Sequence, residues 1–575
     1  MKNLSKLLLI GAALVVLALV LVPAIAQDTP EPGHGGIIIE GNFGGDPATF
    51  NPIICTDTAC QRIYLFMYPN FIGVDPATAL FQKGRPDSLV LDWDISDDGT
   101  VYTFHLRDDW NWTDGTPVTS ADYLYSWNAI KSGVVDTPLG FVTDSIANVE
   151  APDPYTVVVT FNSGDCTALN NAGYIVVLPS HALPADFSAL NDDPYNTNPT
   201  VTGGVFSFGE FRPAEQVSLV ANQDYPGAIN GAVFPEGFIY KVVPDQTVLV
   251  EQFLAGETNV IDGPPENRRS DIHAAADAGD VQEYSFPGNS WDYLSFNLAD
   301  PTNPQNALDA DGNPIDQGHH PLFGDVRVRQ AIAKAINVDE IIQGATFGEA
   351  TRMTSFMIPA SWAYDSELPP IAYDPDAAAQ MLDEAGWRDE DGDGVREAHG
   401  AMYAADGTPF TFTLYTNEGN TRRTAVGTIV QDQLKQIGIN VNFQTIDFNT
   451  LLDIQNAQTF DAIILGWQNS YPDDPDLTQL FTPSADVVGS GSNFTSYNNP
   501  EVTDLNAQAK AVPGCDPADR APLYHQIQEI MQQDLPYVPL YARNGMYAAR
   551  SNVHGFDPYP SQLYWNVDTW TVAQP

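Results

Sequence analysis

Basic residues are scarce in this chain of 575 residues: 24 Lys and Arg stand against 74 Asp and Glu, which gives a formal net charge of −50. Proteins that bind nucleic acid use Lys and Arg to neutralise phosphates, and proteins that adhere to anionic membranes need the same residues. The composition therefore argues against both partners. It does not indicate disorder, because 43% hydrophobic and 11% aromatic residues are enough to bury a large core.

Cysteine is also rare, with four residues at Cys55, Cys60, Cys166 and Cys515. This number excludes a small scaffold held together by disulfides, and the spacing matches neither a zinc ribbon nor a CxxC redox motif. In an oxidising compartment Cys55 could pair with Cys60, which would leave Cys166 for Cys515. Free buried thiols are the alternative, because a sequence does not give the distances between cysteines.

The common catalytic motifs are missing from the sequence. It contains no GxSxG, HExxH, GxxxxGK or GxGxxG pattern, and its one adjacent histidine pair, His319-His320, is typical of a surface loop. With 74 acidic residues, neighbouring carboxylates arise by chance, so their spacing does not identify a hydrolase. We therefore expect a binding protein without catalytic residues, with an exported hydrolase that uses two carboxylates as the alternative from another functional class.

Residues 1–26 differ from the rest of the chain. Two lysines precede an apolar run over residues 7–22, and Ala24-Ile25-Ala26 supplies the small-x-small pattern of a signal-peptidase site. An uncleaved anchor is the alternative, although the run is short for a membrane span. No cysteine lies near the cleavage position, residues 27–33 read as a linker, and no later stretch is apolar enough to cross a membrane. We expect a soluble protein in the periplasm or on the exterior of the cell envelope.

The hydrophobic pattern alternates between strand and helix periods, which indicates an α/β fold. A helix that ends at Lys131 is expected to start at a cap provided by Thr119 or Ser120. The other segments used below are predicted strands at 36–41, 101–106, 155–161, 411–415, 439–444 and 461–466, and predicted helices at 61–71, 247–255, 326–336, 376–385 and 425–437.

One acidic segment resembles a calcium-binding loop. Acidic residues occupy positions 1, 3, 5 and 9 of the loop, glycine occupies position 6, and position 12, where a bidentate Glu normally closes the site, is Gly400. The candidate ligands are Asp389, Asp391, Asp393, the backbone of Val395, and Glu397. An acidic turn between a helix and a strand is the alternative. Apart from this structural calcium we expect no cofactor.

Several segments resemble, in the same order, the extracellular solute-binding proteins, family 5, of peptide and nickel ABC importers. The strongest match spans residues 91–127, including Ser96-Asp97-Asp98-Gly99, Tyr102–Arg107 and Trp112–Thr119. Further matches lie at 46–52, 202–206, 254–257, 325–332, 373–375, 384–387 and 536–541. The resemblance covers nearly all of the chain after residue 33, and it is specific to the family rather than to one ligand.

The resemblance implies a two-lobed periplasmic-binding-protein-like clamp of α/β class with mixed sheets and a discontinuous first lobe. The first lobe would comprise residues 34–290 and 540–575, and the second would comprise residues 291–539. It also implies a monomeric component of an ABC importer that captures short peptides, or a similar extended solute, and presents its closed form to the permease subunits. An oligosaccharide ligand within the same family is the alternative, and a receptor adaptor that signals without import is another.

In peptide-binding members of this family, an Asp soon after a Gly-Trp pair holds the α-amino group of the peptide. Gly466-Trp467 match this pattern, but Ser470 stands where Asp is expected. Either Asp473 or Asp474 takes over this role, or the ligand has no free amino terminus there. Neutral side chains beside Trp467 would suit a sugar or an amide. Packing of the cleft wall is the alternative role for Trp467. The candidate ligand-binding residues are Trp467, Gln468, Asn469, Ser470, Tyr471, Asp473, Trp291, Phe43 and Arg352, the last of these for an anionic group.

Overall fold

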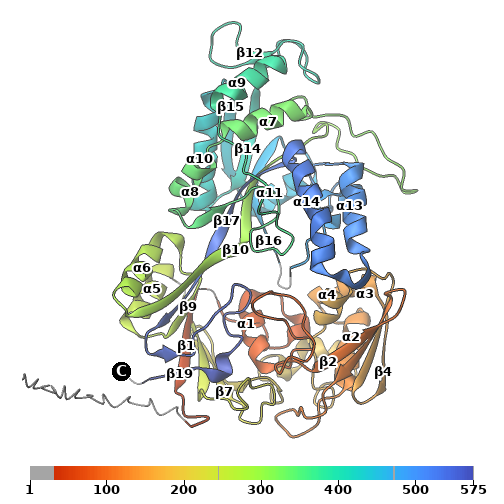
Figure 1. Cartoon of the computed structure of the whole chain (residues 1–575), viewed down its shortest axis with the longest axis vertical. Helices are drawn as coiled ribbons and strands as arrows, with labels where there is room; N and C mark the ends of the chain where they lie inside the picture. Colours follow the sequence, from red (N-terminus) through yellow and green to blue (C-terminus); the bar gives the residue numbers. More distant parts are fainter. Residues whose placement is uncertain (1–30, 44, 244, 470–472, 574–575) are drawn as a thin grey trace, which may run out of the picture.

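The computed structural model describes residues 31–43, 45–243, 245–469 and 473–573, which form two lobes joined by long strands (Figure 1). The predicted signal peptide, residues 1–26, and the first four residues of the predicted linker lie outside the described residues, as do the candidate ligand residues Ser470 and Tyr471. Within the part of the chain that is described, no helix combines the length and apolar character that a membrane span requires.

The lower lobe in Figure 1 combines a four-stranded antiparallel sheet with half of a larger sheet. Its strands are β1 (Ile37–Asn42), β2 (Val90–Ile95), β3 (Val101–Leu106), β4 (Ile146–Asp153), β5 (Thr156–Phe161), β6 (Phe206–Arg212), β7 (Gln216–Ala221), β8 (Gly237–Val242), β9 (Val260–Asp262), β18 (Val553–His554) and β19 (Thr571–Val572). Its helices are α1 (Thr58–Met67), α2 (Ser120–Lys131), α3 (Val142–Ser145), α4 (Ala168–Gly173), α5 (Gln246–Ala255) and α6 (Arg269–Asp277).

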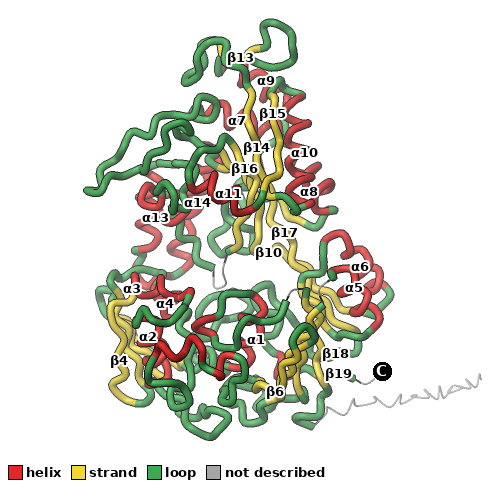
Figure 2. Tube along the Cα trace, turned by 180° about the vertical axis from the view of Figure 1, so that it is seen from behind, coloured by secondary structure: helices red, strands yellow, loops and turns green. Residues whose placement is uncertain are grey.

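The upper lobe carries the other half of the large sheet, with helices on its faces (Figures 1 and 2). Its strands are β11 (Ala350–Arg352), β12 (Trp387–Arg388), β13 (Glu397–Ala398), β14 (Thr411–Asn417), β15 (Asn440–Ile446) and β16 (Ala462–Gln468). Its helices are α7 (Val326–Ala335), α8 (Val338–Thr346), α9 (Pro375–Glu384), α10 (Thr421–Lys435), α11 (Phe448–Asn456), α12 (Thr478–Phe481), α13 (Pro500–Lys510) and α14 (Pro517–Asp534). Short 3₁₀ helices across both lobes are η1 (Pro52–Ile54), η2 (Pro138–Phe141), η3 (Phe187–Asp192), η4 (Pro194–Asn196), η5 (Glu266–Arg268), η6 (Pro483–Ala485), η7 (Pro513–Cys515) and η8 (Val567–Thr569).

Two long strands, β10 (Val281–Phe296) and β17 (Tyr537–Arg550), connect the lobes. They pair antiparallel with each other, and β16 adds to the far side of β10 while β9 adds to the far side of β17. The large sheet therefore runs without a break through both lobes, in the order β15-β14-β16-β10-β17-β9-β1-β8-β7-β6, with β11 paired to β17. It contains parallel and antiparallel pairs, as the predicted mixed sheet requires.

The pairing of β10 with β17 is interrupted between Pro287 and Trp291, where the register shifts. A second shift follows between Asp292 and Tyr293. Such irregularities disrupt the ladder locally and let a strand bend. Buried apolar residues gather in separate clusters on either side of this region. Two clusters draw their members from residues before 282 and after 545, and two from residues 291–542. The exact lobe boundaries at 290/291 and 539/540 stay a prediction.

The four cysteines form two disulfides, Cys55–Cys60 and Cys166–Cys515. Of the two alternatives left open by the sequence, pairing is therefore the one that the structure adopts. The first bond closes a short loop inside the lower lobe. The second joins the loop before α4 in the lower lobe to η7, which lies between α13 and α14 in the upper lobe.

The expectation of a surface loop for the histidine pair is wrong for His320. Its side chain is buried, and its Nε2 lies 3.1 Å from Oδ1 of Asp461. Its ring stacks on Phe323, and its Nδ1 accepts hydrogen bonds from the backbone N–H groups of Leu322 and Phe323. Polar neighbours in the sequence concealed a buried histidine, whose carboxylate partner Asp461 lies 141 positions away along the chain.

Candidate ligand-binding site

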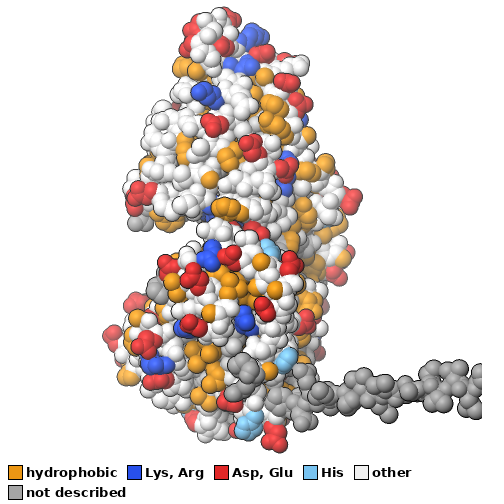
Figure 3. Space-filling view, turned by 90° about the vertical axis from the view of Figure 1, so that its left-hand side faces the viewer, with side chains coloured by type: hydrophobic (Ala, Val, Ile, Leu, Met, Phe, Trp, Pro, Cys, Tyr) orange, Lys and Arg blue, Asp and Glu red, His pale blue; other side chains and the backbone are white. Residues whose placement is uncertain are grey.

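A deep notch separates the two lobes on one side of the molecule (Figure 3). The carboxyl end of β16 and the crossing strands β10 and β17 lie where the lobes meet (Figure 1). A hydrogen bond also joins the lobes here, because Nδ2 of Asn170 on α4 donates to Oδ2 of Asp474, which follows β16. Asp474 therefore contacts the opposite lobe directly.

The wall of the upper lobe at this place is aromatic. Trp467 is half-buried, and its ring stacks at 6.3 Å on Tyr293, which in turn stacks at 4.3 Å on Tyr537. Gln468 ends β16 with its side chain exposed. Trp467 thus packs against the lobe interior and keeps part of its surface accessible, so the two roles considered for it are compatible.

Trp291 has a positioning role. Only 2% of its surface is exposed, and its Nε1 donates to Oδ1 of Asn469 at 3.2 Å. Asn469 is fixed further by Asn289, because the backbone N–H of Asn469 donates to the carbonyl of Asn289 and Nδ2 of Asn289 donates back to the carbonyl of Asn469. The Trp291 ring is therefore packed, and its indole N–H holds the side chain of Asn469 in place.

Asp473 is a buried carboxylate that forms no ion pair with the described residues. Its oxygens accept hydrogen bonds from the Ser361 hydroxyl and, at 3.5 Å, from Nδ2 of Asn469. Among the described residues no Lys, Arg or His lies within 4 Å of its carboxylate, and burial raises its pKa against the opposing effects of these hydrogen bonds and of the more distant charge of Arg520. A cation that arrived beside Asp473 would supply the missing counter-charge.

Asp474 and Asp476 stand next in the chain, with opposite electrostatic properties. Burial, with the charge of Asp476, raises the pKa of Asp474 to about 6, although Nη2 of Arg520 lies 3.9 Å away. Burial alone would also raise the pKa of Asp476, but Lys510 at 2.9 Å and hydrogen bonds from Thr478 and Asn506 hold that pKa below its ordinary value. Asp476 thus has a close cationic partner, whereas Asp473 is held by hydrogen bonds alone and Asp474 has its nearest cation at 3.9 Å.

A second charged group lies at the crossing strands. Asp292 of β10 is 1% exposed and binds Arg422, Nε of Arg423 at 3.2 Å, and the hydroxyl of Tyr541 at 2.8 Å. Both arginines lie in the first turn of α10, where the partial positive charge of the helix terminus disfavours cations. Burial lowers the pKa of Arg422 and of Arg423. One carboxylate thus faces two guanidinium groups, which leaves an excess of positive charge.

Gly466 makes this arrangement possible. A Cβ atom at Gly466 would overlap Oδ1 of Asp292 and the carbonyl of Trp291, and it would lie 2.9 Å from Nη2 of Arg423. Glycine is therefore required at position 466 because Asp292 and Arg423 approach its Cα too closely for a side chain. Its backbone conformation alone would not require glycine.

Two predicted ligand residues lie apart from this group. Nη1 of Arg352 binds Asp339 at 3.0 Å and its Nη2 donates to the carbonyl of Ile371, so the guanidinium already has partners within the upper lobe. Phe43 follows β1 in the lower lobe and is 51% exposed. No contact between the described residues joins either one to Trp467. Their role in binding stays a prediction.

The predicted calcium ligands lie in the hairpin of β12 and β13. One carboxylate oxygen from each of Asp389, Asp391 and Glu397 lies within 4.8 Å of the others. Asp393 is outside this group and accepts a hydrogen bond from the N–H of Val395. Asp389 accepts hydrogen bonds from Gly392 and Gly394. Calcium at this loop stays a prediction.

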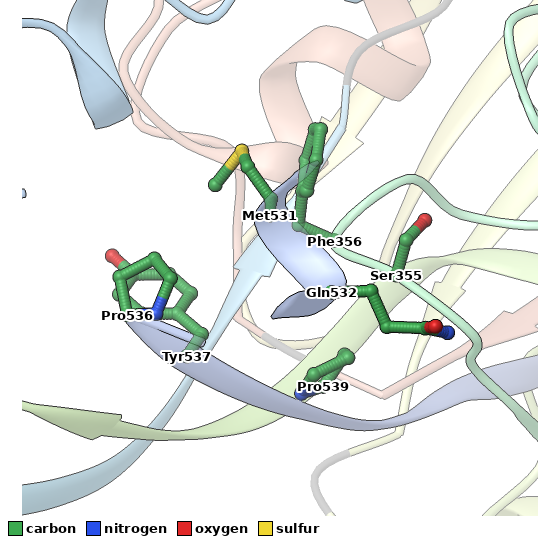
Figure 4. Close-up of a pocket in the computed structure, with 7 residues that line it drawn as sticks. All are labelled: Ser355, Phe356, Met531, Gln532, Pro536, Tyr537 and Pro539. Atoms are coloured by element: carbon green, nitrogen blue, oxygen red, sulfur yellow. The ribbon is translucent and has the colours of Figure 1, made fainter. Parts of the chain in front are cut away.

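A small pocket lies in the upper lobe, behind the aromatic wall to which Tyr537 belongs (Figure 4). It is bounded by the end of α14, the start of β17 and the loop after β11, and its lining residues are Ser355, Phe356, Met531, Gln532, Pro536, Tyr537 and Pro539. None of the predicted ligand residues lines it, and it belongs to the packing around the connecting strands.

The charged residues of the site were largely invisible to sequence reasoning. Asp292 and Arg423 lie 131 positions apart, and Ser361 and Asp473 lie 112 positions apart. For the arginines the signal was weak, since Arg422-Arg423 is one of two adjacent arginine pairs in the chain, the other being Arg268-Arg269.

Comparisons with known proteins agree with the fold. The oligopeptide-binding protein AppA of Bacillus subtilis is 27% identical over 551 residues, covering 95% of this chain and 93% of that protein. The dipeptide-binding protein of Pseudomonas aeruginosa is 24% identical over 556 residues, covering 91% of this chain and 93% of that protein. The structure of AppA from B. subtilis in complex with a nonapeptide matches with a TM-score of 0.68 at 27% identity, covering 95% of this chain and 100% of that one.

These matches confirm the predicted two-lobed clamp of the periplasmic binding proteins, and the predicted family as well. The relatives are binding proteins, which argues against the hydrolase alternative. The description "Bacterial extracellular solute-binding proteins, family 5 Middle" matches residues 87–488. Since this range is more than half of the chain, the protein belongs to the bacterial extracellular solute-binding proteins, family 5, whose members bind solutes and are not enzymes.

Proposed function

We propose that this protein captures peptides outside the cytoplasm and delivers them to the permease subunits of an ABC importer. The observation that carries the proposal is Asp473, a buried carboxylate that forms no ion pair within 4 Å among the described residues and that follows β16 with its half-buried Trp467 in the chain. The relatives named above as oligopeptide-binding and dipeptide-binding proteins support a peptide as the solute.

The two charged groups of the site suit the two ends of a peptide. The ammonium group of a peptide would pair with Asp473, next to Asp474. Asp473 would thus take over the role of the Asp that is expected at position 470, where this chain has Ser470. The carboxylate of a peptide would be drawn to Arg422 and Arg423, because guanidinium groups bind carboxylates through paired hydrogen bonds. Gln468, whose side chain is exposed, offers an amide group to a peptide backbone.

The protein would act as a soluble monomer after export. Cleavage after Ala26 would remove two lysines and no acidic residue, so the mature chain would keep all 74 acidic side chains on 549 residues, since 575 − 26 = 549. This proposal rests on the sequence of the first 26 residues and on the extracellular location that the family description names. Intact mass of the protein from the culture or the periplasm tests it: the mass of the full 575-residue chain would contradict cleavage.

Native mass spectrometry of the purified protein tests the solute class, since a trapped peptide has a mass that fragmentation can read. Thermal shift with a peptide library and a set of oligosaccharides then ranks the classes. Stabilisation by peptides alone supports the proposal. Stabilisation by oligosaccharides alone would contradict it and would favour the alternative suggested by the neutral side chains Gln468 and Asn469 beside Trp467.

Peptides with blocked ends locate the two charges. N-acetylation should weaken binding about tenfold or more in the native protein and much less in Asp473→Asn, because the pair is already lost there. Asp486→Asn is the matched control: Asp486 is another buried Asp of the upper lobe with a pKa raised by burial, and its partners are Gln317 and Gln458. Equal effects of acetylation in all three proteins would exclude Asp473 as the amino anchor.

A further inference from the structure

The disulfide Cys166–Cys515 connects the two lobes at a second place, remote in sequence and in space from the connecting strands. Cys166 lies between Phe161 and Ala168, which belong to the buried core of the lower lobe, and Cys515 lies between Ala509 and Tyr524, which belong to the upper lobe. In Figures 1 and 2, β10 and β17 pass between the lobes on one side, and α13 and α14 reach down to α3 and α4 on the other. The notch is thus bordered by a covalent connection on both sides.

Non-covalent contacts surround this bond. The backbone N–H of Cys166 donates to the carbonyl of Lys510 at 3.0 Å, and Asn170 donates to Asp474 at 3.2 Å. Each of these contacts joins one lobe to the other. The lobes are therefore in direct contact at the disulfide. When the lobes open to exchange the ligand, they must either break this contact or rotate about it.

Both ends of the disulfide are held firmly. On the lower side, Asp165 accepts hydrogen bonds from the N–H and the hydroxyl of Thr167. On the upper side, Cys515 has φ of 56°, in the left-handed region that non-glycine residues seldom adopt, and prolines 513 and 517 flank it. The anchoring turns are too short and too restricted to follow a large movement of the lobes.

We propose that this disulfide limits the opening of the clamp, so that the oxidised protein opens only by rotation about the line that joins the disulfide to the connecting strands. The Cα atoms of the two cysteines are 5.4 Å apart, and disulfides span Cα distances up to about 6.8 Å, so the anchors can separate by little more than about 1 Å. A hinge that opens toward α4 and α13 would need far more. Without the disulfide, the lobes can open both by this rotation and by a hinge movement that separates α4 from α13.

The consequence for binding follows from population shift. A ligand-free protein that opens less spends more time near its binding-competent form, so the disulfide should raise the affinity for the ligand and slow its release. This part rests on the proposed function, whereas the limit on opening does not.

Small-angle X-ray scattering of the ligand-free protein tests the limit on opening. The double variant Cys166→Ser/Cys515→Ser should show a larger radius of gyration and a larger maximum dimension than the native protein. The matched control is Cys55→Ser/Cys60→Ser, which removes a disulfide confined to the lower lobe and should leave both dimensions unchanged. Equal dimensions of all three proteins would overturn the proposal, and so would free thiols at Cys166 and Cys515 in the native protein by peptide mapping.

Reduction of the native protein gives a second route if the double variant does not fold. Tris(2-carboxyethyl)phosphine takes an oxygen from water and becomes its oxide, while the two protons of that water and two electrons convert the disulfide to two thiols. The same increase in dimensions should follow, and air oxidation should reverse it. An unchanged scattering curve with both thiols free would overturn the proposal.

Release rates of a fluorescent peptide, chosen from the library above, complete the test. Release should be several-fold faster from the double variant than from the native protein or the control variant. A change in dimensions without any peptide binding would support the limit on opening and contradict the proposed function. Binding with identical release rates and dimensions would support the function and overturn the limit on opening.

Discussion

At the scale of single residues, Asp292 makes the most demanding contribution to the fold. It is buried against two arginines whose side chains are 15–16% exposed, so its removal would leave two largely buried cations without a counter-charge. We expect Asp292→Asn to lower the free energy of unfolding by about 3 kcal/mol in urea titration. The control is Asp383→Asn, which breaks the pair with Arg396, because the Asp383 side chain is 54% exposed and surface pairs contribute about 0–1 kcal/mol. If both variants lost the same free energy of unfolding, the charge of Asp292 would not be needed to stabilise the two buried arginines.

Gly466 gives a second prediction at this scale. Because its missing Cβ leaves room for Asp292 and Arg423, Gly466→Ala should displace the charged group and cost about 1–3 kcal/mol, as overpacking of a core usually does. Gly140→Ala is the matched control, since a Cβ there meets no atom within 4 Å and the backbone needs no positive φ. Thermal unfolding of both variants decides the matter, and a fully stable Gly466→Ala would contradict the steric argument.

At the scale of helices and strands, the sequence patterns succeeded where a local interaction decides the boundary. The strand at 101–106 matches β3, and the helix ending at Lys131 begins at Ser120 because Thr119 and Asp122 form a capping box. The helix predicted at 61–71 lies instead at 58–67, since Asp57 caps its start and Pro69 follows its end. The pairing of β10 with β17 had no local signal, because it joins segments more than 240 residues apart, and the charged part of the site depends on that pairing.

The hairpin of β12 and β13 carries the prediction of calcium. If Asp389, Asp391 and Glu397 bind the ion, calcium should raise the melting temperature of the native protein, because a ligand of the folded state stabilises it, and magnesium should do so less. Asp391→Asn should remove most of the calcium effect. Isothermal titration of calcium into the protein after chelation gives the direct measurement, and absence of any heat or thermal shift would establish an acidic turn without an ion.

The segment after β16 gives a prediction about pH. The pKa of Asp474 is raised from 3.8 to about 6 in the folded protein. Between these values the folded protein keeps a proton that the unfolded chain has lost, so this group lowers stability as the pH rises from 3.8 to about 6, and the loss persists above that range. Asp474→Asn should therefore be more stable than the native protein at neutral pH, and the difference should vanish below pH 3.8 in denaturant titrations at several pH values.

Asp476→Asn is the control with the opposite sign. The pKa of Asp476 is held below 3.8, so its ionised form contributes stability at neutral pH, which is lost only as the pH falls below that value. The Asn variant should thus be less stable than the native protein at neutral pH. A destabilised Asp474→Asn at neutral pH would show that its interactions with Arg520 and Asn170 outweigh its burial.

At the scale of the whole molecule, the acidic surface and the disulfides act in opposite directions. With 74 acidic and 24 basic residues the folded chain repels itself, and Figure 3 shows acidic side chains spread over both lobes. Such repulsion falls as the lobes move apart, but it is spread over the surface and acts on no specific pair of segments. Salt screens it over about 8 Å at physiological ionic strength. The covalent connections, in contrast, act on specific pairs of segments, and their effect depends on how much chain they enclose.

The two disulfides should therefore differ in what they contribute to stability. Cys55 and Cys60 are separated by 5 positions and Cys166 and Cys515 by 349. In the chain-entropy description, closing the short loop restricts the unfolded chain by about 2 kcal/mol, and the long loop restricts it two to three times as much. Melting temperatures should fall further for Cys166→Ser/Cys515→Ser than for Cys55→Ser/Cys60→Ser. If the lobes unfold independently, Cys166→Ser/Cys515→Ser would lose only contacts between the lobes. Calorimetry would then resolve the thermal unfolding of this variant into two transitions. If both variants showed a single transition and the same fall in melting temperature, the entropic argument would be contradicted. The same result would contradict the view that the disulfide connects two lobes that can unfold independently.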